Sequence, residues 1–363
     1  MKCGIVGLPN VGKSTLFNCL SNAKAQSANF PFCTIEPNVG MVTVPDSRLN
    51  KLEELVNPER VMPATVEIVD IAGLVKGASK GEGLGNKFLG NIRECNAIIH
   101  VLRCFENDNI THVDGSINPL RDKETIDFEL QLKDLETLEK RVDKHRKAAR
   151  TGNKSEQVIV DLLDRLKNHL EQGKSVRSFE RNEDEDELIK ESHFLTEKPI
   201  LYLCNVDEAA AKDGNEWVEK VKEMAAEEGA EVIYLAAATE ADISELESYE
   251  ERTMFLEDLG LEEAGVNKVI RAAYDLLDLQ TYFTAGVKEV RAWTIKKGFT
   301  APQAAGVIHT DFEKGFIRAE VIAYEDYANY GSESKARDAG KLSVEGKEYV
   351  VQDGDVMHFR FNV

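Results

Sequence analysis

The chain has 363 residues, of which 42% are hydrophobic and 30% charged, with 65 acidic against 45 basic side chains and a formal net charge of −20. This length and composition exclude disorder of the whole chain and are enough for two or three domains with proper cores. The negative charge argues against a protein that coats nucleic acid with its entire surface, so any RNA contact must be a local patch.

The six cysteines are scattered through apolar stretches without a C-x-x-C pair. This pattern favours reduced core thiols over a disulfide framework or a zinc site. The first apolar run is too short for a signal peptide, and no later run approaches the roughly 18 residues that a membrane span needs. We therefore expect a soluble cytoplasmic protein with no membrane partner, and nothing in the sequence demands more than a monomer.

The predicted elements begin with a buried strand at residues 2–8, a turn-rich loop and a helix that starts at Lys13. Further strands are predicted at 39–44, 65–70, 97–102, 200–204 and 232–235. Helical or glycine-rich segments separate them, which is typical of a parallel, helix-covered sheet. We assign this α/β domain to residues 1–120 and 198–277.

Residues 121–197 form an insertion of a different kind. One predicted helix has an apolar face made by Phe128, Leu132, Leu135, Leu138 and Val142. A second follows a break at 151–153, with an inner face made by Val158, Ile159, Leu162, Leu166 and Leu170. Two such faces can bury each other, which predicts an antiparallel, coiled-coil-like helical hairpin. The alternative is that both helices pack on the sheet.

Residues 278–363 change pattern again. Strand-like pieces separated by glycine and aspartate turns, with one helical stretch at 302–308, predict a small α+β unit.

A phosphate-binding motif follows the first strand. Residues 7–14, GLPNVGKS, satisfy G-x-x-x-x-G-K-[ST] between a strand and a helix, where the motif is required. The glycines let backbone N–H groups surround a β-phosphate, Lys13 bridges the β- and γ-phosphates, and Ser14 offers an oxygen to Mg²⁺. A tight structural turn is the alternative.

A second motif, Asp70-Ile71-Ala72-Gly73, ends an apolar run. Asp70 is expected at the end of a strand, where it can hold the Mg²⁺ shell, while the Gly73 N–H can approach a γ-phosphate oxygen. Thr34 is the candidate for a further Mg²⁺ ligand, with a plain surface role as the alternative. Glycines at 73, 77, 81, 83 and 85 favour a switch that orders on γ-phosphate contact over a plain flexible loop.

Residues 205–208, NVDE, stand where GTPases of this build carry N-K-x-D. The final carboxylate of that tetrad accepts hydrogen bonds from guanine, but here Val206 replaces the lysine and Glu208 the aspartate. Adenine lacks those donors, and Asn205 can still reach its N7 and N6, so the sequence favours ATP. GTP bound by a shifted Glu208 is the alternative. Ala236 and Ala237 are expected in the loop under the base.

Together, the segments GLPNVGKST, FPFCTIEPNVG, DIAGLVKGASKGEGLGNKFLGNIRECN and NVDE resemble the YchF family, Obg-related P-loop proteins that prefer ATP. The resemblance extends into residues 278–363, where KGFTAPQAAGVIHTDFEKGFIRAEV and DGDV are similar to a TGS domain, a ubiquitin-like β-grasp fold. It implies nucleotide and Mg²⁺ positions at Asn10, Val11, Gly12, Lys13, Ser14, Thr15, Thr34, Asp70, Gly73, Asn205 and Glu208.

Leu74 stands where Ras-type enzymes carry a glutamine that orients the attacking water. Leucine has no hydrogen-bonding group, so unassisted hydrolysis is expected on the order of 10⁻³ s⁻¹ or less. His112, in a polar loop, is our candidate for positioning water, a role that similar proteins are thought to give a loop histidine. A merely solvated histidine is the alternative, and His100, within a strand, is expected to be structural. Asn10 suggests a further hypothesis, because related K⁺-dependent enzymes place an asparagine three residues before the lysine to help hold the cation.

Two local groups of basic residues reverse the acidic character of the chain. The first surrounds the tip of the predicted hairpin and contains Lys140, Arg141, Lys144, Arg146, Lys147, Arg150 and Lys154. The second, in the C-terminal unit, contains Lys288, Arg291, Lys296 and Lys297. A phosphate backbone can dock on such patches, although solvated helix charge is the alternative. The resemblance implies an association with translation, so we favour the ribosome or ribosomal RNA as partner.

The sequence thus predicts a slow, Mg²⁺-dependent ATPase that couples its nucleotide state to ribosome or RNA binding. A GTPase of the Obg class is one alternative, and a nucleotide-bound scaffold or stress regulator with little turnover is another. A kinase for a small acceptor is disfavoured, because the long glycine-rich segment suits a conformational reporter.

Overall fold

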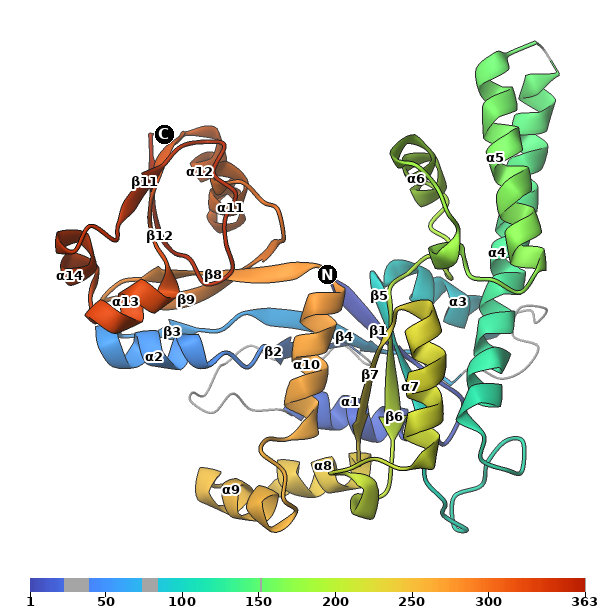
Figure 1. Ribbon diagram of the computed structural model, residues 1–363, viewed down its shortest axis with the longest axis horizontal. Helices are drawn as coiled ribbons and strands as arrows, with labels where there is room; N and C mark the ends of the chain where they lie inside the picture. The colour runs from blue at the N-terminus through green and yellow to red at the C-terminus, as the bar shows by residue number, and fades with distance from the viewer. Residues whose placement is uncertain (23–38, 74–83, 151, 363) are drawn as a thin grey trace. The chain divides into compact units, whose positions relative to one another are not determined.

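A computed structural model describes residues 1–22, 39–73, 84–150 and 152–362 (Figure 1). The chain forms two compact units. The first contains the described residues 1–22, 39–40 and 67–269, and the second contains 41–66 and 270–362.

The sheet on which the first unit is built has the strand order β2-β4-β1-β5-β6-β7. Its strands are β1 (Lys2–Val6), β2 (Val39–Thr43), β4 (Thr65–Asp70), β5 (Ala97–Arg103), β6 (Ile200–Asn205) and β7 (Glu231–Leu235). The pairs from β4 through β1, β5 and β6 to β7 are all parallel. Every residue of β5 and β6 is buried, as expected for central strands of a sheet covered on both faces. The predicted parallel α/β fold is confirmed.

Helices lie between these strands or follow the last of them, β7. They are α1 (Lys13–Asn22), α3 (Leu84–Glu94), α7 (Glu216–Glu228), α8 (Ala237–Glu245), α9 (Tyr249–Asp258) and α10 (Gly265–Leu276), with a 3₁₀ turn η2 (Glu208–Ala210). Helix α1 packs against α8, and α7 packs against β6 and β7. Because the strands are parallel, the loops that follow β1, β4, β6 and β7 leave the sheet at one edge, which is where the predicted motifs lie.

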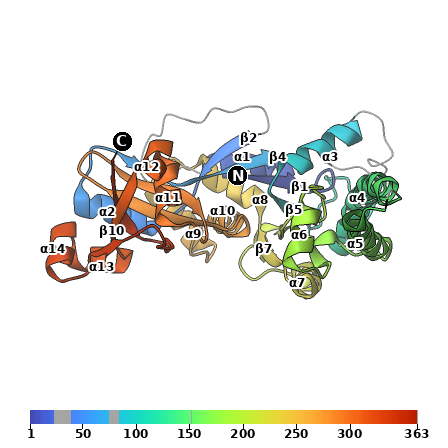
Figure 2. The ribbon, with the colours of Figure 1, turned by 90° about the horizontal axis from the view of Figure 1, so that it is seen from above.

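A helical arm is inserted between β5 and β6, and it confirms the predicted helical insertion. It consists of α4 (Pro119–Ala149), α5 (Lys154–Glu171), the 3₁₀ turn η1 (Val176–Ser178) and α6 (Glu183–Lys190). The Asn118 side chain caps the start of α4 by accepting the Arg121 N–H, and Gly152, with φ +88°, occupies the turn before α5. Helices α4 and α5 lie side by side in both views (Figures 1 and 2).

The two halves of α4 pack on different partners. Its distal half shares an apolar core with α5 and α6, built around Leu138, Leu166 and Ile189. Its first half buries Ile126 and Leu130 and packs against β5 and α7. The predicted hairpin packing therefore holds for the distal half of α4, and the alternative, packing on the sheet, holds for its first half.

Two members of the predicted apolar faces do not belong to the core. Phe128 is 58% exposed and Val158 is 65% exposed. Phe128 lies where α4 packs on the sheet unit through a different face, so the expected continuous stripe was wrong at that end. Val158 lies one turn into α5, before the helix reaches the buried positions that begin at Val160.

A mixed sheet organises the second unit, with the order β11-β10-β12-β8-β9-β3. Its strands are β3 (Val61–Met62), β8 (Leu279–Ala285), β9 (Val290–Lys296), β10 (Phe316–Ile322), β11 (Ser343–Glu345) and β12 (Val356–Phe361). Its helices are α2 (Ser47–Val56), α11 (Ala301–Ile308), α12 (Thr310–Lys314), α13 (Tyr324–Tyr330) and α14 (Glu333–Asp338). Strand β12 runs parallel to β8, whereas β8 and β9 form an antiparallel pair.

Adjacent residues of β8 show how helices cover both faces of this sheet. Tyr282 points into the core under α11 and donates a hydrogen bond to the Ala304 carbonyl at 3.0 Å. Phe283 therefore points to the opposite face, where Arg48 of α2 stacks over its ring at 5.3 Å and Tyr324 of α13 lies beside it. Residues 41–66 thus belong to this unit, a grouping that local sequence patterns did not indicate.

Five cysteines, Cys3, Cys19, Cys95, Cys104 and Cys204, are buried, and none of them forms a disulfide within the described residues. Cys33 lies outside the described residues. In the described part of the chain, no helix combines the length and the apolar character needed to cross a membrane.

Candidate nucleotide-binding site

The loop between β1 and α1 has a backbone that its sequence explains. Gly12 has φ +99°, and a Cβ atom there would lie 2.3 Å from the Asn205 side-chain nitrogen, so a larger residue does not fit. Asn10 also adopts a positive φ of 62°, which asparagine tolerates better than most residues. The loop ends at the first turn of α1, where free backbone N–H groups and the helix dipole favour an anion such as a phosphate.

Lys13 and Gly73 come together beside this loop, as the motifs predict. The Lys13 ammonium is buried and donates a hydrogen bond to the Leu8 carbonyl at 2.6 Å. Burial lowers the pKa of Lys13 to about 8, with the nearby Asp70 carboxylate opposing the shift. A Cβ atom at Gly73 would be 3.2 Å from Lys13 Nζ and 3.3 Å from Pro9, so the Gly73 backbone lies directly against the loop.

Asp70 and Ser14 form the second part of the site. Ser14 Oγ donates to Asp70 Oδ2 at 3.3 Å. The other carboxylate oxygen, Oδ1, is buried and has no hydrogen-bond partner within the described residues. Burial raises the pKa of Asp70, while the charge of Lys13 and the Ser14 hydrogen bond act against this rise. An orphaned carboxylate oxygen beside a hydroxyl group fits a hard divalent cation that prefers oxygen ligands.

Several predicted positions of the switch lie outside the described residues: Thr34, Leu74, Gly77, Gly81 and Gly83. Gly85 lies in the first turn of α3.

Asn205 joins the phosphate-binding loop to the loop after β7. Its Nδ2 donates to the Val11 carbonyl at 2.9 Å, and its Oδ1 accepts the Ala237 N–H at 2.9 Å. Asn205 was predicted to reach the base, but both of its polar atoms are bonded to backbone groups here. Asn205 therefore fixes the distance between two loops of the site.

The remaining predicted base-contact residues differ in exposure. Val206 is buried and donates its N–H to the Leu235 carbonyl at 2.9 Å. Ala236 and Ala237 are also buried, and α8 begins at Ala237. Glu208 is exposed, in the short η2 turn. A base contact by Glu208 therefore requires little rearrangement of the core.

His112 is tied to the base of the arm. Its Nε2 lies 2.8 Å from Asp122 Oδ2, and its Nδ1 accepts the Asp114 N–H at 3.1 Å. The histidine is only 8% exposed, which excludes the merely solvated loop histidine that was the alternative. His100 is buried in β5, and burial lowers its pKa to about 3, which favours the neutral ring.

Sequence reasoning missed Asp122 and Arg103, the two residues that hold this loop in place. Arg103 ends β5, and its buried guanidinium donates to three carbonyls of the following loop. Asp122 lies in the first turn of α4, and this position is its only sequence signal. The side chains of His112, Asp114 and Asp122 could also hold a metal ion. Arg121 already supplies a cation there, 3.1 Å from Asp122 Oδ1 and 3.7 Å from Asp114.

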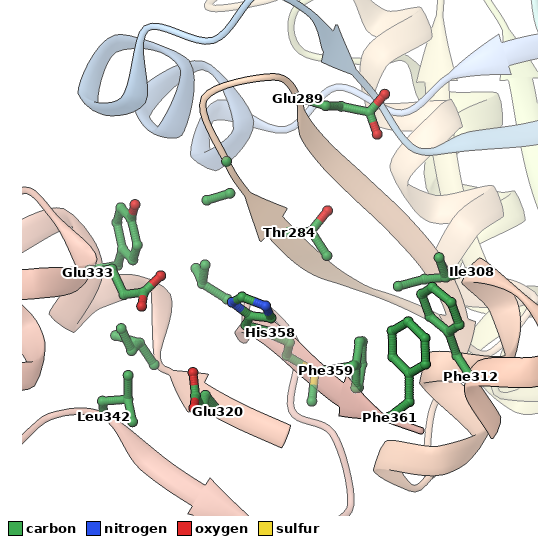
Figure 3. Close-up of a pocket in the computed structure, with 16 residues that line it drawn as sticks. Thr284, Glu289, Ile308, Phe312, Glu320, Glu333, Leu342, His358, Phe359 and Phe361 are labelled. Atoms are coloured by element: carbon green, nitrogen blue, oxygen red, sulfur yellow. The ribbon is translucent and has the colours of Figure 1, made fainter. Parts of the chain in front are cut away.

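A separate cavity of about 300 Å³ lies in the second unit (Figure 3). Its walls include Glu289, Glu320 and Glu333, together with the stacked rings of Phe312 and Phe361. Each of the three carboxylates is paired with an arginine: Arg60, Arg360 and Arg337, respectively. The lining therefore offers no unpaired carboxylate that would single out a ligand.

Three features define a P-loop nucleotide-binding protein. They are the parallel sheet, the glycine-bounded loop at the start of α1, and the cluster of Lys13, Ser14, Asp70 and Gly73. A family model described as 50S ribosome-binding GTPase matches residues 2–134, and the YchF-GTPase_C model, described as a protein of unknown function, matches residues 279–362.

Full-length relatives give the family. The chain is 59% identical to the Ribosome-binding ATPase YchF of Haemophilus ducreyi, over 100% of this chain and 99% of the relative. It is 58% identical to the protein of the same name from Bacillus subtilis, over 100% of both. A solved structure of the Schizosaccharomyces pombe YchF GTPase has a TM-score of 0.90 and 39% identity, covering 99% of this chain and 97% of that one. The chain belongs to the YchF family, which confirms the resemblance read from its motifs.

Proposed function

We propose that this chain is a slow, Mg²⁺-dependent ATPase that docks on the ribosome. Its contacts with the ribosome change when the bound nucleotide changes. The observation that carries the proposal is the meeting of Lys13, Asp70 and Gly73 around the loop that opens α1. The names of full-length relatives at 58–59% identity support both the ATPase activity and the ribosome as partner.

The reaction is attack of a water oxygen on the γ-phosphorus. A new P–O bond forms as the bond to the β–γ bridging oxygen breaks, and the proton released from water ends on the phosphate product. Lys13 neutralises charge on the β- and γ-phosphates, and the Gly73 N–H can donate to a γ-oxygen. Ser14, Asp70 and the predicted Thr34 would hold Mg²⁺, which neutralises phosphate charge when bound.

Leu74 has no group that can orient the attacking water, so an unassisted rate on the order of 10⁻³ s⁻¹ or less is expected. We assign the orientation of the water to His112. A K⁺ ion beside Asn10 is a further hypothesis, and equal hydrolysis rates in K⁺ and Na⁺ buffers would contradict it.

The choice of ATP rests on the NVDE tetrad. Glu208 is longer than the aspartate that reads guanine, and the lysine of that tetrad is replaced by the buried Val206. A GTPase is the second candidate, because one family model and the S. pombe structure carry that word in their descriptions. A scaffold with little turnover differs from both only in its measured rate.

The tip of the arm is the proposed docking surface for ribosomal RNA. Three of its seven basic residues are already in ion pairs: Lys140 with Glu136, Arg141 with Glu191, and Arg146 with Asp164. Four others are exposed and make no ion pair with any described residue: Lys144, Lys147, Arg150 and Lys154. These four can bind phosphates without breaking an internal pair.

The second unit is proposed to be a TGS domain. The β8–β9 hairpin, the α11 helix over one sheet face and the parallel β12–β8 pair support a β-grasp arrangement. In its basic group, Lys297 pairs with Asp275 and Arg291 stacks on Trp293, whereas Lys288 and Lys296 are exposed.

Side-by-side binding and hydrolysis of ATP and GTP, with and without ribosomes, test the proposal. We expect tighter binding of ATP and faster hydrolysis when ribosomes are present. A triple variant, Lys144→Glu, Lys147→Glu and Arg150→Glu, should lose co-sedimentation with ribosomes and stimulation by them, but keep its basal rate. A control with the same charge change at Lys190, Lys220 and Lys222 should keep both. Tighter binding of GTP than of ATP would overturn the proposed preference for ATP. Unaltered co-sedimentation of the tip variant would overturn the proposed docking surface.

A further inference from the structure

The loop between β5 and α4 is held in one shape by a buried arginine. Arg103 is 2% exposed, and its guanidinium donates to the carbonyls of Phe105 at 3.2 Å, Asn107 at 3.2 Å and Ile110 at 2.9 Å. It also stacks over the Phe105 ring, 4.6 Å from the centroid. The guanidinium is planar and rigid, and its hydrogen bonds to three backbone carbonyls fix the path of the chain up to His112.

At the end of this loop, both nitrogens of the His112 ring are engaged. Because Nδ1 accepts the Asp114 N–H, a neutral ring carries its proton on Nε2, and that N–H donates to Asp122 Oδ2. The His112 and Asp122 side chains are only 5% and 2% exposed. In this arrangement the ring has no nitrogen left to bind a water molecule.

The other oxygen of Asp122 is also occupied. Arg121 Nη2 lies 3.1 Å from Asp122 Oδ1, and the same guanidinium donates to the Ser116 carbonyl at 2.6 Å and hydroxyl at 2.9 Å. The first turn of α4 and the loop before it are thus joined through one carboxylate. A charge-assisted network whose central pair, His112 and Asp122, is buried holds these two side chains in a single geometry.

This network lies between two functional parts of the first unit. On one side, Asn10 of the phosphate-binding loop donates to the carbonyl of Thr111, next to His112, at 3.1 Å. On the other side, α4 continues without a break from Asp122 to Ala149, beside the basic tip of the arm. Movement of either the loop or the helix relative to the other would change the geometry at His112.

We propose that Asp122 is a positioning residue that withholds His112 from the reaction, and that opening of the His112–Asp122 contact precedes water activation. The proposal rests on the role given to His112 above. It requires only that the Nε2–H leave the carboxylate, after which the ring can bind water. Asp122 therefore limits the basal rate without contacting the nucleotide.

Single-turnover hydrolysis of ATP by Asp122→Ala and Asp122→Asn tests this. We expect hydrolysis at least about fivefold faster in Asp122→Ala, with a smaller gain in Asp122→Asn, because the amide oxygen still accepts the Nε2–H without the charge. The dissociation constant for ATP should not change. Asp108→Asn, an exposed acidic residue of the same loop, is the matched control and should keep the parent rate.

Combination with His112→Ala separates this proposal from the proposed function. If the gain acts through His112, the Asp122→Ala, His112→Ala double variant is as slow as His112→Ala alone. If His112→Ala leaves hydrolysis unchanged, both the role of His112 and the proposal are wrong. If His112→Ala abolishes hydrolysis but both Asp122 variants, folded by thermal unfolding, are as slow as the parent or slower, only the withholding role is wrong.

Discussion

Gly73 lies so close to Lys13 that a Cβ atom on the glycine would be 3.2 Å from the lysine ammonium. The added methyl group of Gly73→Ala should therefore displace the Lys13 ammonium, which is proposed to neutralise the phosphates, or block the proposed approach of the γ-phosphate to residue 73. We expect hydrolysis about tenfold slower, equivalent to about 1.4 kcal/mol in the activation free energy. Single-turnover assays with labelled ATP measure this.

Gly90 supplies the matched control for that experiment. It lies in α3, and a Cβ atom there would meet nothing within 4 Å. Gly90→Ala should keep the parent rate and add about 0.5–1 kcal/mol to the free energy of unfolding, because alanine is the better helix former. If both glycine variants hydrolyse ATP at the parent rate, Gly73 does not approach the phosphates.

The depressed pKa of Lys13, about 8, makes nucleotide binding depend on pH. Phosphate oxygens favour the charged ammonium, so the pKa of Lys13 rises in the complex, and binding above about pH 8 takes up a proton. ATP affinity should therefore fall as the pH rises through about 8. Calorimetry in buffers of different ionisation enthalpy should show proton uptake at about pH 9 and almost none at about pH 7. Lys13→Arg stays charged and should show neither effect, whereas equal affinity of the parent at both pH values would contradict the prediction.

Removal of the Asn205 side chain should weaken the site for every nucleotide. Asn205→Ala leaves the Val11 carbonyl and the Ala237 N–H without their partner, at a cost of about 1–3 kcal/mol for each buried group that stays unpaired. We expect ATP and GTP dissociation constants to rise by similar factors, because the loops and not the base lose support. A loss confined to one nucleotide would show that Asn205 reads the base directly.

A shorter acidic side chain at position 208 should shift the preference between bases. Glu208 is exposed, so Glu208→Asp costs little stability while restoring the aspartate of the guanine-reading tetrad. The ratio of the GTP to the ATP dissociation constant should fall by about threefold or more, about 0.7 kcal/mol. Glu216→Asp, the same change at an exposed site in α7, should leave the ratio unaltered. An unchanged ratio in both variants would mean that Glu208 does not face the base.

Local patterns were sufficient for the strands of the parallel sheet and for the phosphate-binding loop. The strand predicted at 65–70 has those bounds in the structure, where Val66 and Ile68 are buried, because the apolar run that marks the strand is a local pattern. The spacing of glycine and lysine at 7–13 likewise predicts a loop conformation that depends mainly on residues close to one another in the sequence. The sequence by itself therefore determined the class of fold and the family, and it located the candidate phosphate-binding loop.

Contacts between distant positions were decided only by the tertiary structure. Asn205 meets Val11 across 194 positions of the chain, and this pairing makes it a link between loops. The neighbours of His112 depend on where α4 starts and how its first half packs on β5, neither of which leaves a periodic signal near the histidine. A side chain's hydrogen-bond partners follow from the packing of whole elements, and no local motif encodes that packing.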